Sequence, residues 1–208
     1  PGVIESYRKG AENAKAAGFD GVEIHGANGY LIDQFLQNST NRRTDAYGGS
    51  IENRARFMME VTDAVVSVWG ADRVGMHIAP RCDSHDMGDS DPAALFGHVA
   101  RELGQRKLAF LCAREFHDKH ALGPMLKKEF GGVYIANEGF TAESAREAIT
   151  SGHADAVAFG KPAIANPDLV ERLRVGAAWN APHPETFYGS GPAGYLDYPR
   201  LEEIQTKN

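Results

Sequence analysis

Short runs of apolar residues alternate along this chain with longer segments in which apolar residues recur every three or four positions. The short runs have the length of buried strands, and the recurring pattern is typical of amphipathic helices. Strands that alternate with helices are typical of parallel sheets with helical crossovers, which places the chain in the α/β class. We expect about five strand–helix units, with strands at residues 21–24, 74–78, 108–112, 133–136 and 156–159.

Several of the helical segments begin at recognisable start signals. Ser90-Asp91-Pro92 combines an N-cap candidate with a proline at the first helical position, and Thr141 is a second N-cap candidate. Gly123-Pro124 and Asn166-Pro167 are expected to open two further helices. From Ala177 onward the chain is rich in proline and glycine, and we expect an extended segment there.

Two architectures accommodate this succession of units. One is an open, doubly wound sheet, and the other is part of an eight-stranded (β/α)8 TIM barrel. A complete barrel needs about 250 residues, so 208 residues with about five βα units would form an incomplete barrel. No composition shift or linker divides the chain, and we expect a single domain over residues 1–208.

Composition narrows the class of partner. The net charge is −6 and no run of lysine or arginine exceeds two residues, which disfavours a nucleic-acid partner. No apolar run approaches the roughly 20 residues of a membrane span, and no signal peptide is visible. The two cysteines, Cys82 and Cys112, indicate a reducing compartment, so we expect a cytoplasmic protein. The first residue is Pro1 rather than methionine, which indicates part of a longer chain.

The segment after the first strand carries the most informative chemistry of the chain. Residues 21–24 are followed by His25, Asn28 and Tyr30. An imidazole and a carboxamide can hold an oxygen by hydrogen bonds, and a phenol can donate a proton. Groups at the carboxyl ends of barrel strands face the active site. An isolated pair of this kind more often bonds to neighbouring backbone carbonyls, so the spacing alone leaves a structural role open.

Longer motifs occur at residues 23–31, 33–36, 41–45, 47–50, 52–56, 158–160, 166–169 and 194–199. In this order they resemble the Old Yellow Enzyme family, and within it the bacterial xenobiotic, glycerol trinitrate and N-ethylmaleimide reductases. The resemblance extends over essentially the whole chain. It corresponds to the later part of that fold, from the helix before the fourth strand to the C-terminus.

The resemblance implies an FMN-binding barrel that passes hydride from NADH or NADPH to a small molecule: an activated alkene, a nitrate ester or a nitro compound. It implies that His25 and Asn28 bind the substrate oxygen and that Tyr30 protonates the substrate's α-carbon. The family's first strands, which supply part of the flavin cradle, have no counterpart here. We therefore expect the missing N-terminal half or another chain to cover the open strand edges.

The loops after the last two strands are candidates for the FMN phosphate, because barrels often bind phosphate there. These loops contain Asn137, Gly139, Gly160 and Lys161. Glycine lets the backbone approach a phosphate, and lysine adds positive charge.

Some positions near the flavin depart from the family pattern. His77 stands where the family commonly has an arginine beside the pyrimidine ring, and Lys161 also replaces a more usual arginine. Asn137-Glu138 replaces a glycine-rich turn. Arg81 is a candidate to compensate for His77. Histidine can be neutral at pH 7 whereas arginine stays charged, so we expect altered flavin affinity and redox tuning.

Two other functions remain open. A barrel lyase or isomerase would use the same phosphate loops on a phosphorylated substrate without flavin, and a noncatalytic barrel piece would serve as a packing or assembly module. No metal is expected, because the metal-capable side chains match no site template. These are Cys82, Asp83, His85 and Asp86, and separately His117, Asp118 and His120.

Overall fold

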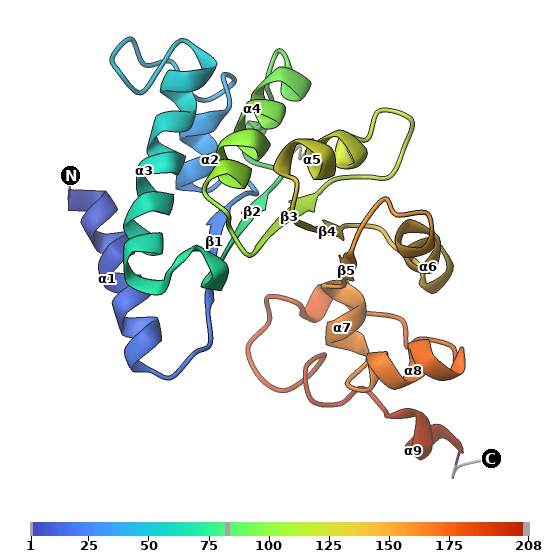
Figure 1. The fold of residues 1–208 in the computed structure, drawn as a ribbon. Helices are drawn as coiled ribbons and strands as arrows, with labels where there is room; N and C mark the ends of the chain where they lie inside the picture. Colours follow the sequence, from blue (N-terminus) through green and yellow to red (C-terminus); the bar gives the residue numbers. More distant parts are fainter. Residues whose placement is uncertain (1, 82–83, 206–208) are drawn as a thin grey trace.

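The computed structural model describes residues 2–81 and 84–205 of the chain. Five parallel strands form one sheet, and neighbours in space are also neighbours in sequence (Figure 1). A doubly wound sheet reverses its strand order at one point, so the unbroken order of the described strands excludes that alternative. The strands are β1 (Val22–Gly26), β2 (Val74–Ile78), β3 (Phe110–Arg114), β4 (Val133–Asn137) and β5 (Ala156–Ala158).

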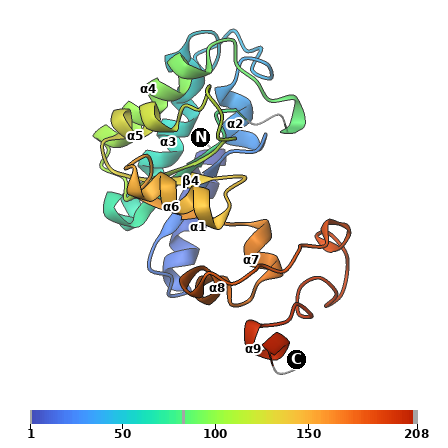
Figure 2. The ribbon, with the colours of Figure 1, turned by 90° about the vertical axis from the view of Figure 1, so that its right-hand side faces the viewer.

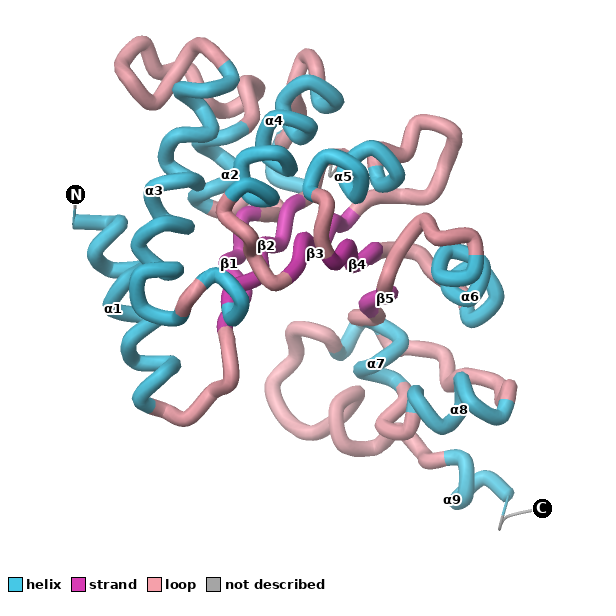
Figure 3. The backbone as a smooth tube through the Cα atoms, in the orientation of Figure 1, coloured by secondary structure: helices cyan, strands magenta, loops and turns pink. Residues whose placement is uncertain are grey.

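The crossover helices cover one side of the sheet, and the C-terminal segment runs along the other side (Figure 3). A side view places the last two helices and the segment between them away from the helices that follow β1 and β2 (Figure 2). The described helices are α1 (Gly2–Ala16), α2 (Leu31–Leu36), α3 (Ile51–Trp69), α4 (Pro92–Gln105), α5 (Gly123–Phe130), α6 (Ala142–Thr150), α7 (Lys161–Ala165), α8 (Leu169–Val175) and α9 (Leu201–Gln205).

The register of the strands separates an apolar face from a polar one. Ile24, Met76 and Leu111 are aligned across β1, β2 and β3, and all three are buried in the core. Side chains alternate between faces along a strand, so the next aligned residues, His25 and His77, lie on the opposite face. We call the side of Ile24, Met76 and Leu111, which the helices cover, the outer face. The side of His25 and His77 is the inner face.

The inner face is tightly filled at one point near the amino ends of the strands. A Cβ atom added to Gly75 would lie 2.2 Å from the Phe110 ring on the neighbouring strand. The ring therefore covers the backbone of β2 at this position. Only glycine leaves the space that the ring occupies.

The predicted helix start signals are confirmed where the structure has clear caps. Asp91 Oδ1 accepts a hydrogen bond from the Ala94 N–H at 3.0 Å, and Thr141 Oγ1 accepts one from the Ser144 N–H at 3.1 Å. Helix α5 begins at Gly123, as predicted. The helix predicted to open at Asn166-Pro167 begins later, at Leu169.

The third strand begins two residues later than residues 108–112 predicted. The Ala109 N–H donates to the carbonyl of Ala71, in the turn before β2, at 3.0 Å and to that of Val74, the first residue of β2, at 2.9 Å. The paired register of β3 begins at the next residue, Phe110. The strand ends at Arg114, two residues later than predicted, and the Arg114 side chain lines the cavity above the inner face. Three short helices were not predicted, because one or two turns give no readable periodicity. These are α2, α7 and α9.

A buried arginine fixes the C-terminal segment to α8. Arg172 is 1% exposed and donates to Asp168 Oδ1, to the Ala178 carbonyl and to the Pro199 carbonyl, at 2.7, 2.7 and 2.9 Å. The predicted extended tail is therefore held at two points beyond the helix. None of the described helices combines the length and the apolar character that a membrane crossing requires.

Candidate functional site

The site is built around the turn that joins β1 to α2. Asn28 and Gly29 both have left-handed backbone, with φ of 59° and 75°. Asparagine tolerates this conformation better than most residues, and glycine adopts it freely. A Cβ atom added to Gly29 would also lie 2.7 Å from the Cβ atom of His85. The turn therefore needs glycine at this position, and it sends Asn28 and Tyr30 to the carboxyl end of β1.

The buried carboxylate of Asp33 holds this turn through hydrogen bonds. Asp33 is fully buried, and it accepts hydrogen bonds from the Gly29 N–H at 2.9 Å and from Gln37 Nε2 at 2.8 Å. Burial raises the pKa of Asp33 to about 6, although both hydrogen bonds oppose that rise. The hydrogen bonds that hold the turn therefore depend on whether Asp33 carries a proton.

We expect the Asp33→Asn variant to lose a pH dependence of stability that the native chain has. The ordinary pKa of this group is 3.8, and the folded value is about 6. Between these values the unfolded chain has lost the proton while the folded chain retains it, so the contribution of Asp33 to stability falls as pH rises. The difference in unfolding free energy between native and variant chains should fall by roughly 2 kcal/mol from pH 4 to pH 7.

Urea unfolding at several pH values measures this difference. The exposed carboxylate of Asp20 provides a matched control in Asp20→Asn, which should unfold in parallel with the native chain over the same range. A difference between native and Asp33→Asn chains that stays constant with pH would show that Asp33 is not perturbed in the folded state.

Three aromatic rings meet at the carboxyl ends of β1 and β2. The His25 ring lies 5.3 Å from the His77 ring and 5.4 Å from the Tyr30 ring, measured between centroids. Desolvation lowers the pKa of His25, and it lowers the pKa of His77 to about 4, with smaller contributions from the charges of His25 and Arg114. Both imidazoles are therefore neutral at pH 7, and each has an N–H to donate.

A cavity of about 700 Å³, which we call the main cavity, opens above the inner face. Seven of the nine predicted site residues line it: Asn28, Tyr30, His77, Asn137, Gly139, Gly160 and Lys161. Pro182 and Tyr188 of the C-terminal segment also contribute to its wall. The cavity thus joins the turn after β1 to the two loops expected to bind phosphate.

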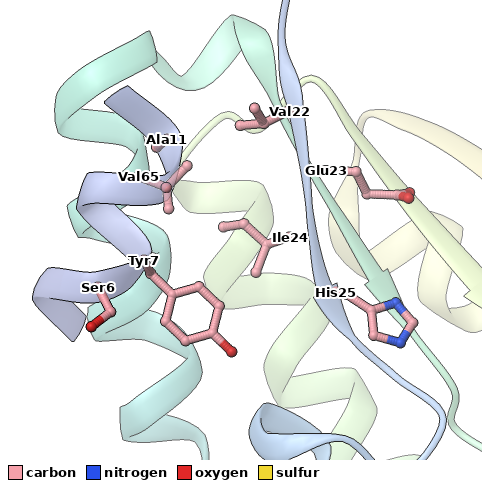
Figure 4. A pocket seen from close by; sticks show the side chains of 9 residues that line it. Ser6, Tyr7, Ala11, Val22, Glu23, Ile24, His25 and Val65 are labelled. Atoms are coloured by element: carbon pink, nitrogen blue, oxygen red, sulfur yellow. The ribbon is translucent and has the colours of Figure 1, made fainter. Parts of the chain in front are cut away.

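The structure does not place His25 in that cavity. His25 lines a neighbouring cavity of about 450 Å³ along the open edge of β1, together with Tyr7 of α1. In Figure 4, His25 and Glu23 extend from one side of the strand, and Tyr7 and Ile24 lie on the other. His25 therefore stands between the two cavities, in ring contact with Tyr30 and His77.

Arg81 does not line the main cavity either. Its guanidinium forms a two-pronged pair with the Asp118 carboxylate, at 2.8 and 2.7 Å, and lies 3.9 Å from Glu115. The Asp118 pKa is lowered to about 2 by this pairing. Arg81 thus pairs with the loop after β3, and its flavin-binding role stays a prediction.

Arg114 is a site residue that the sequence did not reveal, and the sequence indicated Glu138 only as a replacement in a glycine-rich turn. Arg114 Nε donates to Glu138 Oε2 at 2.7 Å, and Arg114 Nη1 donates to Asn28 Oδ1 at 2.9 Å. Both Arg114 and Glu138 line the main cavity. The available signal was a charged residue at the carboxyl end of a barrel strand, which was hidden because β3 was expected to end at residue 112.

The two loops after β4 and β5 have the features of a phosphate cradle. A Cβ atom added to Gly139 or Gly160 would meet nothing within 4 Å, so the backbone is open to a ligand at both positions. Asn137 Nδ2 donates to the Ala158 carbonyl at 2.9 Å, which ties the loops together. The Lys161 side chain is 64% exposed and lies 3.9 Å from Glu138.

The inner face also offers a hydrogen-bonding atom, His77 Nε2, to a planar polar ligand. Among the described residues, His77 Nε2 is the buried side-chain atom that has no hydrogen-bond partner. A buried polar atom of this kind calls for a partner. Together with the glycine loops and Lys161, it fits a phosphorylated heteroaromatic group such as FMN.

The metal-capable side chains do not gather into a cluster in the part of the chain that the structure describes. There, no group of three or more histidine, cysteine, aspartate or glutamate side chains is placed to hold an ion. His85 instead donates from Nδ1 to the Asn28 carbonyl at 2.9 Å. Cys82 and Asp83 lie outside the described residues.

Comparison with known proteins agrees with this geometry. Residues 2–180 match the NADH:flavin oxidoreductase / NADH oxidase family. The chain is 50% identical over 199 residues to a probable flavin mononucleotide-dependent alkene reductase of Leishmania infantum, covering 94% of this chain and 54% of that protein. It is 44% identical to 12-oxophytodienoate reductase 1 of Oryza sativa subsp. japonica, covering all of this chain and 57% of that protein.

Solved structures give the same result. Morphinone reductase in complex with tetrahydroNAD superposes with a TM-score of 0.92 at 48% identity, over 97% of this chain and 56% of that one. An Old Yellow Enzyme homologue from Zymomonas mobilis also has a TM-score of 0.92, at 40% identity. The chain belongs to the NADH:flavin oxidoreductase / NADH oxidase family. It spans little more than half the length of these relatives, and its five βα units form an incomplete barrel.

Proposed function

We propose that this chain is the later part of an FMN-dependent oxidoreductase that reduces activated alkenes, nitrate esters or nitro compounds at the expense of NADH or NADPH. The observation that carries the proposal is the turn after β1. Asn28 and Tyr30 of this turn line the main cavity together with the loops around Gly139 and Gly160, and the His25 ring contacts the Tyr30 ring. The chemistry named for two of the relatives, alkene and 12-oxophytodienoate reduction, supports this assignment.

Bound FMN, once reduced by NADH or NADPH, supplies the hydride in this proposal. His25 and Asn28 hold the acceptor's oxygen by donating hydrogen bonds from an imidazole N–H and a carboxamide N–H. Since the pKa of His25 is lowered, its imidazole donates this bond in the neutral form at pH 7. The two donors are strongest when negative charge builds up on that oxygen.

Tyr30 completes the acceptor site by handing a proton to the carbon next to the activating group. Its side chain is accessible, since the residue is 58% exposed, and its ring lies beside both His25 and His85. A nitrate ester has no such carbon to protonate. Tyr30 is therefore needed for alkenes and dispensable for nitrate esters.

Other residues of the chain are assigned to hold FMN itself. Lys161 and the backbone at Gly139 and Gly160 would bind the phosphate, with Asn137 keeping their two loops together. His77 would donate to the pyrimidine end of the ring from its neutral imidazole. These contacts lie within one domain, residues 1–208, which we propose to be the part of the barrel from its fourth strand onward.

Flavin binding tests the proposal. We expect the 208-residue chain alone to bind FMN weakly, because the cavity beside β1 is open, and we expect the chain co-expressed with an N-terminal barrel half to be yellow. Anaerobic NADH or NADPH should bleach the flavin absorbance of this flavin-loaded protein, and an activated alkene should restore it. A colourless co-expressed protein of the correct intact mass would contradict the proposal and favour a lyase, an isomerase or a noncatalytic piece.

A further inference from the structure

We propose that Arg114 is a positioning residue that fixes which end of the Asn28 carboxamide faces the acceptor. The inference rests on the proposed function, because it concerns the same oxygen-binding site. Its starting point is the placement of Arg114 at the last position of β3, aligned with Asn137 of β4. From there its side chain reaches past β2 to the turn after β1, and contacts a residue 86 positions earlier in the chain.

Hydrogen bonds to Glu138 and to Asn28 fix the orientation of the guanidinium. Nε donates to the Glu138 carboxylate at 2.7 Å, while Nη1 donates to Asn28 Oδ1 at 2.9 Å. The Arg114 and Glu138 side chains are 22% and 19% exposed, so this pair is largely shielded from water. A guanidinium is planar and presents its donors in a fixed fork. Fixing Nε on Glu138 therefore fixes the direction of Nη1.

This contact imposes a direction on Asn28. A carboxamide has an accepting oxygen and a donating amino group, whereas a guanidinium only donates. Arg114 can therefore bind only the oxygen, so the amino group is on the opposite side of the carboxamide. Without Arg114, the carboxamide could turn over and present its oxygen to the acceptor. Two oxygens would then face each other, and the donor needed for the developing negative charge would be lost.

Glu138 has a role in this arrangement that its position in a phosphate-type loop does not explain. A carboxylate beside a phosphate would repel it, yet Glu138 has a left-handed backbone with φ of 92° and lines the cavity. Its charge is balanced by Arg114 on one oxygen and by Lys161 at 3.9 Å from the other. Glu138 thus serves as the anchor that holds the guanidinium against Asn28.

A double-mutant cycle on the flavin-loaded protein tests the positioning role. The probe is 4-chlorophenol, whose oxygen accepts hydrogen bonds and whose binding is followed by the change in flavin absorbance. Arg114→Gln should weaken binding about tenfold, the loss expected for one misaligned charged-group hydrogen bond. In an Asn28→Ala background the same substitution should have little further effect, because the carboxamide that Arg114 orients is gone.

A simple loss of positive charge predicts a different cycle. Arg114→Gln would then weaken the binding of the probe's phenolate form equally in the native and the Asn28→Ala backgrounds. Equal losses would overturn the inference. Arg114→Lys keeps the charge beside Glu138 and provides a second variant for the same cycle. Arg101→Gln is the matched control, since Arg101 lies on α4, does not line the main cavity and forms an ion pair with Glu129 at 2.9 Å.

Nuclear magnetic resonance of the 208-residue chain without flavin separates this inference from the proposed function. The side-chain amide protons of Asn28 should shift and exchange faster with water in Arg114→Gln, and should be unchanged in Arg101→Gln. Unchanged Asn28 signals in Arg114→Gln would overturn the positioning role even if the protein proves to be an active reductase. A changed signal in a protein that never binds flavin would support the contact and reject the function.

Discussion

The Asn28→Ala and His25→Ala variants of the flavin-loaded protein should each pass electrons to an activated alkene about 10²–10³-fold more slowly than the native protein. That is the usual cost of removing one preorganised donor from a site where negative charge develops. Each variant should also bind phenol-type ligands more weakly. The reduction of flavin by NADH or NADPH is expected to slow as well if the nicotinamide amide uses the same two donors.

Stopped-flow absorbance resolves the two half-reactions. His98→Ala is the control for His25→Ala, since His98 lies on α4, away from the main cavity. It should leave both half-reactions at the native rate. Rates within threefold of native for both Asn28→Ala and His25→Ala would show that neither residue holds the acceptor's oxygen.

The Tyr30→Phe variant should affect the two classes of acceptor differently. Flavin reduction should remain near the native rate, whereas alkene reduction should fall steeply, by about 10²–10⁴-fold, because the carbon no longer receives its proton from a positioned acid. Nitrate-ester reduction requires no protonation of carbon and should be largely retained. The contrast between the two acceptors is what identifies a proton donor.

The same stopped-flow experiment provides the test, with the alkene and the nitrate ester used in turn. Tyr195→Phe removes another exposed phenol, whose oxygen donates to the Phe187 carbonyl at 2.9 Å in the C-terminal segment, and serves as the control. If Tyr30→Phe slowed flavin reduction and both acceptors equally, Tyr30 would have a packing role and no role as an acid.

Much of the fold was predictable because its signals are local. The apolar runs identified all five strands, and the Asp91 and Thr141 caps marked helices that begin where predicted. Local patterns do not include distant hydrogen bonds, and this explains the shift of β3. Ala109 bonds to Ala71 in the turn before β2 and to Val74 at the start of β2, and the pairing of β3 with its neighbours runs from Phe110 to Arg114.

The candidate site was predictable where residues are close in sequence or carried by a motif. The segment from His25 to Tyr30 and the loops around Gly139 and Gly160 belong to this group, and most of their members line one cavity. The Arg114 contact with Asn28 joins residues on non-adjacent strands. It depends on strand register and on the end of β3, so neither composition nor spacing could reveal it.

The buried carboxylate of Asp33 has a consequence for how this site can change. The Asn28 carboxamide, which we propose to bind the acceptor's oxygen, and the Tyr30 phenol are carried by a single short turn. The buried Asp33 carboxylate holds that turn by accepting a hydrogen bond from the Gly29 N–H. A shift of the turn would displace both side chains together, so binding and protonation of an acceptor would drift in step. Attempts to change the acceptor preference should therefore exchange residues 25–37 as one segment. A single replacement would leave the new side chain among contacts that fit the original residues.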